Sequence, residues 1–525
     1  MLDFISPLFA KAGIAALVAC LILIITMHFL RKVIKNVEMR IFISLAISYF
    51  ASLVFYSFSF KQWVAEATQV INYFLETIGW MFLAPASFII ILIVAAYFLE
   101  KKLTAQEFRT FWHILGGLLI LIFTIFNREL GFLITSYTIL GFLVMEYLRK
   151  LPEESLFTNF VKKSFHKAIR DNEIASFMAS IFFLTGCWII IYMFAKTPAI
   201  VLLLILTLGD ASAVITGKKL GRDKLKYNLH KSIQGSTAMF LIIMVILLAF
   251  KFNLIFAFIV AIVVALLESL PLNMSDNLII PVASIMLFIG ITNAIQYFNF
   301  WLYIFPIALF FIVYLPKLLD LKSSLVVFLF GALVLNGLIN SLAYFFIIST
   351  FLIINALAWN AKRIRKCLKI KENVWKTRTI NTVIASGMIP ALIAVLGNVY
   401  LLTGAISAAL AETMANKIGS FYPHPRLITN MKKKKPGTRG AVSWYGYVAA
   451  LMACLITGLI IVITTQIFGI KTAFWPIFAI AIIAGLGAIT LNSLMGIVLG
   501  YLAKEEIDVI STLLGVAIAA ALMLI

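Results

Sequence analysis

The sequence predicts an all-α, polytopic integral membrane protein of about 18 transmembrane helices, built as two parallel-repeat halves. The first observation is composition: of 525 residues, 63% are hydrophobic and 12% are charged, too few charges to cover a soluble protein of this length. The second is that apolar runs of about 18 residues or more recur along the whole chain. The third is that the loops between these runs carry lysine and arginine on one side only, as the positive-inside rule requires.

The apolar runs define the expected helices in chain order. The first is followed by "RKVIK" without a small-residue cleavage site, so we expect a retained helix and not a cleaved signal peptide. We expect helices near residues 12–30, 41–58, 80–99, 112–126, 130–147, 174–194, 199–216, 236–250, 254–268, 278–295, 299–315, 323–339, 342–359, 380–396, 399–415, 444–468, 473–499 and 507–525.

The positive charge sets the expected topology. Alternation of the helices places every basic loop on one face, which the positive-inside rule assigns to the cytoplasm, most simply at a cell inner membrane. The net charge of +21 is therefore explained by topology, and we expect no nucleic-acid partner. The four cysteines are far apart and predict neither a disulfide framework nor a zinc site. The basic loops are 31–40, 100–110, 149–172, 217–235, 361–378 and 416–440.

A polar pattern appears twice. The stretch "LGDASAVITGKKLGRDKLKYNLHKSIQGSTAMF" begins at Leu208, and "AETMANKIGSFYPHPRLITNMKKKKPGTRGAVSWY" begins at Ala411. Aligned without gaps, six positions correspond at a constant offset of 202 residues. An even number of predicted helices separates the copies, so both face the same side and the repeat is parallel. The pairs are Asp210/Glu412, Ala213/Ala415, Gly217/Gly419, Lys231/Lys433, Gly235/Gly437 and Ser236/Thr438.

The first copy has the residue types that bind phosphate. A carboxylate at a membrane boundary is costly and points to function, and Asp210 could hold Mg²⁺, which takes one or two carboxylates plus phosphate oxygens. Glycines let backbone N–H groups approach a phosphate, lysines neutralise it, and the helix after Gly235 offers its positive N-terminus. The remaining members of the expected cradle are Gly217, Gly221, Lys218, Lys219, Lys224, Lys231, Ser232 and Ser236.

Each feature also has a structural reading. Gly217 and Gly221 fit a helix-packing motif equally well, and single lysines fit the positive-inside rule. Downstream, Glu268, Asp276 and Asn277 form a second acidic group that suits metal-assisted phosphoryl transfer. Upstream, His113 is either a general base or an interfacial histidine with a structural partner.

These stretches resemble a known family. "GDASAVITGKKLG", "HKSIQGS", "ESLPLNMSDNLIIP", "RTFWH" and "LGFLVMEYLRKLPEE" are similar to the dolichol kinase, phytol kinase and yeast diacylglycerol kinase family, over about residues 80–300. The resemblance implies a membrane enzyme that phosphorylates a lipid alcohol, with CTP as donor and Mg²⁺ as cofactor. Thr110 stands where the family usually has a lysine. The implied site comprises Asp210, Lys231, His113, Glu268 and Asp276 as catalytic residues, Asp210 and Asp276 as metal ligands, and Gly209, Gly217, Gly221, Ser232, Gly235, Ser236 and Asn277 at the nucleotide.

The C-terminal half resembles a second family, which includes plant phytyl-phosphate kinase. "PGTRGAVSWYG", "RTINTVIASGMIPALIAVL" and "GLGAITLNSLMG" carry the likeness. Two acids of that family's pattern are changed, to Glu412 and Asn492, which predicts weak or absent activity in this half. The implied second site comprises Glu412, Lys433, Gly437, Thr438 and Ser443.

The chain is therefore expected to be a lipid-alcohol kinase fused to a domain that could phosphorylate the resulting monophosphate. The expected regions are N-terminal membrane helices in residues 1–79, a kinase-like domain in residues 80–316 and a second domain in residues 317–525. The alternatives are a cytidylyltransferase that makes a CDP-lipid, and a membrane transporter. Apolar pocket walls look alike, so the sequence leaves open which alcohol is used, and CTP or ATP as the donor.

Overall fold

The fold is known from a computed structural model that describes residues 26–27, 39, 43–44, 47, 105–149, 178–272, 274–297, 299–360, 380–498 and 503–523. Apart from isolated positions, the described residues do not include the helices predicted near 12–30, 41–58 and 80–99. The predicted N-terminal region, residues 1–79, lies outside them for the same reason. Two compact units are present, Met1–Leu270 and Pro271–Ile525. They are called the N-terminal unit and the C-terminal unit below.

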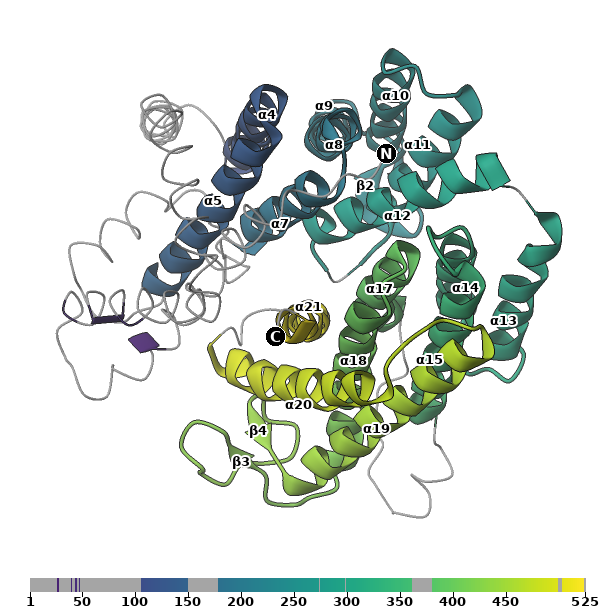
Figure 1. Ribbon diagram of the computed structural model, residues 1–525. Coiled ribbons are helices and arrows are strands. Elements are labelled where there is room, and N and C mark those ends of the chain that lie inside the picture. The colour runs from purple at the N-terminus through teal and green to yellow at the C-terminus, as the bar shows by residue number, and fades with distance from the viewer. Residues whose placement is uncertain are drawn as a thin grey trace, which may run out of the picture. The chain divides into compact units, whose positions relative to one another are not determined.

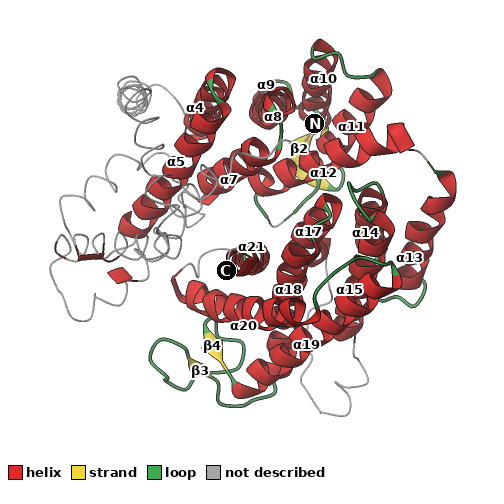
Figure 2. Ribbon diagram, viewed as in Figure 1, coloured by secondary structure: helices red, strands yellow, loops and turns green. Residues whose placement is uncertain are grey.

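The chain is an all-α polytopic membrane protein, as predicted. Among the described residues, seven helices are long and apolar enough to cross a membrane by length and composition, and further apolar helices are shorter. Every helix predicted between residues 112 and 525 is present, with ends that differ by a few residues. Figure 2 shows that the strands of the described residues are confined to two short pairs between helices.

The N-terminal unit is a set of packed helices interrupted once by a hairpin (Figure 1). Helix α4 packs on α5 and α8, α5 packs on α7, and α10 packs on both α9 and α11. Its described elements are α4 (Ala105–Phe126), α5 (Arg128–Arg149), α7 (Met178–Met193), α8 (Lys196–Leu204), the π-helical turn η2 (Ile205–Gly209), α9 (Asp210–Lys219), β1 (Lys224–Leu225), β2 (Asn228–Ser232), α10 (Ile233–Ala249) and α11 (Leu254–Ser269).

The C-terminal unit is built around one helix, α18, which packs against α19, α20 and α21. Small residues allow this close approach: a Cβ added to Gly404 of α18 would lie 2.4 Å from the carbonyl oxygen of Gly515 in α21. The described elements are α12 (Asp276–Tyr297), the 3₁₀ turn η3 (Phe300–Tyr303), α13 (Ile304–Tyr314), α14 (Leu321–Leu335), α15 (Ser341–Asn360), α17 (Ile380–Leu396), α18 (Val399–Gly419), β3 (Arg426–Leu427), β4 (Ala441–Val442), α19 (Trp444–Ile467), α20 (Phe474–Val498) and α21 (Lys504–Met523).

The same local arrangement occurs once in each unit. Helix α9 is followed by the antiparallel pair β1–β2 and then by α10, which packs back on α9. Helix α18 is followed by the antiparallel pair β3–β4 and then by α19, which packs back on α18. This helix–hairpin–helix arrangement is the structural form of the repeat predicted from sequence.

Candidate active site

Asp210 lies where the regular helix changes. Helix α8, η2 and α9 form one continuous run, Lys196–Lys219, that is apolar enough to span a membrane. Within it, Ile205–Gly209 form a π-helical turn, and Asp210 is the next residue. Single π turns inside α-helices occur frequently at functional sites because the extra residue rotates the helix face that follows. Here the turn directly precedes the carboxylate.

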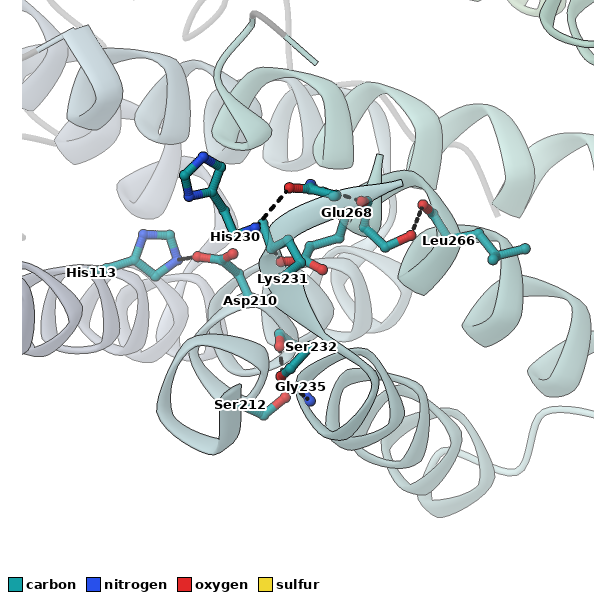
Figure 3. Close-up of polar contacts among 12 residues, drawn as sticks. His113, Asp210, Ser212, His230, Lys231, Ser232, Gly235, Leu266 and Glu268 are labelled. Carbon is teal, nitrogen blue, oxygen red and sulfur yellow. Dashed lines mark hydrogen bonds and ion pairs between the residues drawn. The ribbon is translucent and has the colours of Figure 1, made fainter. Parts of the chain in front are cut away.

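His113 of α4 faces this carboxylate (Figure 3). Its Nε2 lies 3.7 Å from Oδ2 of Asp210 and 3.5 Å from the carbonyl oxygen of Leu206. The ring also packs on Phe183, with centroids 4.1 Å apart. Side-chain exposure is 13% for His113 and 17% for Asp210, so the pair is enclosed without being sealed from solvent.

A second polar pair is formed by Lys231 of the hairpin and Glu268 of α11 (Figure 3). The ammonium Nζ of Lys231 donates to the carboxylate Oε1 of Glu268. Glu268 is 2% exposed and Lys231 is 27% exposed. The buried carboxylate therefore anchors a lysine whose side chain is only partly buried.

The hairpin itself is held on the end of α11. Asn228 Nδ2 donates to the backbone oxygen of Ser269 at 2.9 Å, and the hydroxyls of Tyr227 and Ser269 are 2.8 Å apart. These contacts fix the position of β2 and, with it, the direction in which Lys231 points.

Each of the three glycines of the first copy lies where a Cβ would meet atoms of a neighbouring residue. A Cβ on Gly221 would lie 2.1 Å from the Gly217 carbonyl oxygen, and a Cβ on Gly235 would lie 2.9 Å from the Ala213 carbonyl oxygen. Ser232 is the N-cap of α10, and its hydroxyl accepts from the Gly235 N–H at 3.2 Å. Of the predicted helix-packing pair, Gly217 packs on Ser232 and Gly235, whereas Gly221 lies in the loop after α9. A phosphate-binding role for these glycines remains a prediction.

The other predicted residues of this copy are placed as follows. The Ser236 hydroxyl, one residue after Gly235, is buried without a hydrogen-bond partner in the described structure, as is that of Thr207 in η2. Gly209 ends the π turn beside Met239 and Ile243 of α10. Asp276 and Asn277 begin α12, which belongs to the C-terminal unit, so their joint role with Asp210 also remains a prediction.

The C-terminal unit has a corresponding polar centre with different chemistry. Glu412 of α18 is 8% exposed, and its Oε1 accepts from Asn492 Nδ2 of α20 at 2.6 Å. The carboxyl of Asp508 in α21 is within hydrogen-bonding reach of Glu412, and the Lys504 ammonium lies close by. The sequence interpretation noticed Asn492 but missed Asp508, although an acidic residue in an apolar helix is the signal that could have found it.

The structure corrects the gapless repeat. Ser443 is the N-cap of α19 and its hydroxyl accepts from Gly446 N–H at 3.2 Å, as Ser232 does from Gly235. Gly419 packs on Ser443 and Gly446 as Gly217 packs on Ser232 and Gly235. The offset is thus 202 residues up to Gly419 but 211 for the cap, nine residues more.

The predicted pairing of Lys231, Gly235 and Ser236 with Lys433, Gly437 and Thr438 is therefore wrong. Gly437 has a φ of +86° in an open turn, where its Cβ position meets no atom within 4 Å, whereas Gly235 lies inside a helix contact. The longer second hairpin takes up the nine extra residues, and an alignment without gaps could not show this. With the corrected offset, Val442 of β4 stands in the place of Lys231.

These geometries can be set beside known proteins. Residues 304–513 match the family described as integral membrane protein DUF92. The C-terminal part of the chain is thus similar to DUF92 integral membrane proteins. An uncharacterised membrane protein of Methanocaldococcus jannaschii is 28% identical over 183 residues, covering 33% of this chain and 73% of that protein. No solved structure matches the chain.

The donor set limits which metal chemistry the site can support. Within the described ranges, no group of three or more His, Cys, Asp or Glu side chains is placed to hold a metal ion. A cage made by protein ligands alone is therefore not formed there. Mg²⁺ bound with a nucleotide needs only one or two carboxylates, because phosphates and waters supply the other oxygens. Asp210, a single carboxylate whose side chain is 17% exposed, meets that smaller requirement.

Proposed function

We propose that the N-terminal unit transfers the γ-phosphoryl group of a nucleoside triphosphate, CTP first among the candidates, to the hydroxyl of a membrane lipid alcohol. The observation that carries the proposal is a set of two charged pairs: Asp210 and His113 at the π turn within a membrane-spanning run, and Lys231 and Glu268 where the following hairpin meets α11. The sequence resemblance to lipid-alcohol kinases supports the same chemistry. The isoprenoid class of the alcohol and the use of Mg²⁺ belong to this proposal.

In the proposed reaction, the lipid hydroxyl attacks the γ-phosphorus. The bond from the γ-phosphorus to the bridging oxygen breaks, a new phosphorus–oxygen bond forms, and the nucleoside diphosphate leaves. The hydroxyl proton must go to a base, and His113 is the residue suited to accept it. Its Nε2 faces the Asp210 carboxylate and the Leu206 carbonyl, which favours the tautomer protonated there and leaves Nδ1 as the acceptor. A carboxylate that orients an imidazole in this way also stabilises the imidazolium formed.

Phosphoryl transfer depends mainly on positioning and on charge neutralisation. Lys231 would bind a phosphate oxygen while Glu268 keeps the lysine side chain extended. Asp210 would hold a nucleotide-bound Mg²⁺, which when present neutralises charge on the phosphates. The apolar helices around the site would keep the lipid tail in the bilayer while its hydroxyl reaches the polar centre.

The decisive experiment incubates purified protein with CTP or ATP and a panel of lipid alcohols, and identifies the products by mass spectrometry. Label in the γ-phosphate should appear on the lipid. Asp210→Asn should lower turnover by at least about 100-fold, since misplacing charge at such a site costs that much. Asp320→Asn makes the same chemical change at an exposed residue before α14 and should leave turnover unchanged.

Other outcomes would reject the proposal. A CDP-lipid carrying the α-phosphate would indicate cytidylyl transfer in its place. Near-normal turnover in well-folded Asp210→Asn would remove Asp210 from the reaction. Flux of a solute without any phosphorylated lipid would favour the transporter alternative.

A further inference from the structure

The segment between α18 and α19, residues 421–443, is called the basic hairpin here. It contains six cationic residues and no acidic residue, and the sequence holds no Asp or Glu between Glu412 and Glu505. Residues 431–439 are all exposed. Lys432–Lys435 form no ion pair with any described residue. Among the described residues, the positive charge of these four lysines is therefore not neutralised by an ion pair.

The hairpin is ordered by backbone hydrogen bonds. Arg426 and Leu427 pair with β4 on one side, and Arg426 bridges to Lys433 on the other. Leu427 N–H donates to the Lys432 carbonyl at 3.0 Å, and Lys434 N–H donates to the Pro425 carbonyl at 2.8 Å. The backbone that carries the lysines is thus ordered by a two-stranded pair and one further bridge, and little backbone conformational entropy is lost when an anionic surface binds them.

Aromatic residues place the hairpin beside the membrane. Helix α19, a candidate span, begins at Trp444 directly after the hairpin. Trp444 is 64% exposed, and its ring lies 5.5 Å from that of Tyr445, which lies 5.4 Å from that of Tyr422. Exposed Trp and Tyr at the end of a spanning helix occupy the interface of the bilayer. The loops around β3 and β4 project outside the helices of this unit (Figure 1).

The corresponding hairpin of the N-terminal unit is built differently. Its Lys231 turns inward to Glu268, and its Asp223 pairs with Gln234. In the basic hairpin, Val442 replaces that inward lysine, and the cations are spread along an exposed edge. Cations spread along an exposed edge match the phosphates of a bilayer surface, which lie in one plane. They match the compact triphosphate group of a nucleotide less well.

We propose that the basic hairpin binds the phosphate headgroups of anionic phospholipids in the bilayer that holds α19. Basic segments next to a spanning helix are attracted by an anionic leaflet within about one Debye length. The contact belongs to the C-terminal unit and is independent of the phosphotransferase proposal.

The test uses the full-length protein with its four cysteines replaced by serine and a fluorophore on Asn430→Cys, an exposed hairpin position. The protein is reconstituted into phosphatidylcholine vesicles with or without phosphatidylglycerol, both containing the same small fraction of lipid with a nitroxide on its headgroup. We expect quenching at least about twofold stronger in the anionic vesicles, because cations near an anionic leaflet are drawn to it. Raising the ionic strength from about 0.1 M to about 1 M should remove the difference, since the Debye length shortens to about 3 Å.

Matched variants and a soluble anion complete the test. Changing Lys432, Lys433, Lys434 and Lys435 to Gln should abolish the difference between vesicles. Changing Lys218, Lys219, Lys224 and Lys226 to Gln removes the same charge from the end of α9 and the first hairpin, and should preserve the difference. Equal quenching in both kinds of vesicle, or no loss in the hairpin variant, would overturn the proposal. So would a response only to pyrophosphate added to phosphatidylcholine vesicles, which would assign the lysines to a soluble phosphate. Gel filtration checks that each variant is folded.

Discussion

At the scale of single residues, the candidate site depends on charges that satisfy one another. Glu268 is almost fully buried, and the Lys231 ammonium contacts it directly. Removing one partner of such a contact leaves the other charge desolvated and uncompensated. Asp210 differs, because its neighbour His113 lies at 3.7 Å and both side chains keep some exposure. The contact between Lys231 and Glu268 is therefore expected to matter for the stability of the fold, and that between His113 and Asp210 mainly for the proposed reaction.

This difference gives a prediction for Lys231 and Glu268. Lys231→Met should destabilise the detergent-solubilised protein by about 1–3 kcal/mol, because the buried Glu268 carboxylate loses its charged donor. The double variant Lys231→Met/Glu268→Gln should recover some of that loss, because no buried charge is then left without its partner. Thermal unfolding followed by fluorescence-detected gel filtration measures both variants. A double variant less stable than Lys231→Met alone would contradict this view of the pair.

At the scale of elements, two helix contacts determine where the polar groups lie. The π turn before Asp210 interrupts the spanning run of α8 and α9, and the packing of α9 on α10 brings Ser232 against Gly217 and Gly221. In the C-terminal unit, the contact of α18 with α21 brings Glu412 to Asp508. Small residues make that second contact possible.

Substitution at this helix contact should therefore be costly. Gly404→Ala places a Cβ 2.4 Å from the Gly515 carbonyl oxygen, and the backbone must shift to relieve it, at a cost of about 1–3 kcal/mol. Gly141→Ala is the matched control, because a Cβ there meets no atom within 4 Å. It should be neutral or stabilising by up to about 1 kcal/mol, since alanine favours helix. Equal melting temperatures for the two variants would show that α18 and α21 are not so closely packed.

At the scale of the whole molecule, the two hairpins are expected to face the same side of the membrane. Asn228 is buried and bonded to Ser269, so Leu229, which is 71% exposed, is the better labelling position in the first hairpin. In a cysteine-free background, Leu229→Cys and Asn430→Cys should react with an impermeant maleimide from the same side, the cytoplasmic one. Labelling from opposite sides would disprove the parallel topology.

The two units should also divide the chemistry. We expect alcohol phosphorylation to be lost in Asp210→Asn and retained in Glu412→Gln, because Glu412 is enclosed by Asn492 and Asp508. Conversion of a prenyl monophosphate to the diphosphate should be weak or absent, since an asparagine supplies no negative charge for a metal. Both products can be followed by mass spectrometry. Efficient diphosphate formation that survives Asp210→Asn but is lost in Glu412→Gln would assign a working site to the C-terminal unit.

Much of this architecture was determined by the sequence. Length and hydropathy of each apolar run located the helices, because a membrane requires every backbone group to be bonded within its own helix. The helix portion of the repeat was also readable, since Gly217 and Gly419 must both let a neighbouring helix approach. Asp210 was found because a carboxylate in an apolar run is costly without a purpose.

Only the tertiary structure decided which polar groups meet. His113 and Asp210 are 97 residues apart in the chain and touch because α4 packs beside η2. The nine extra residues of the second hairpin, and the contact of Asp508 with Glu412, depend on pairings between segments that local patterns do not encode. Helical periodicity fixes which residues share a face of one helix, but partners on other helices are selected by the packing of the whole unit.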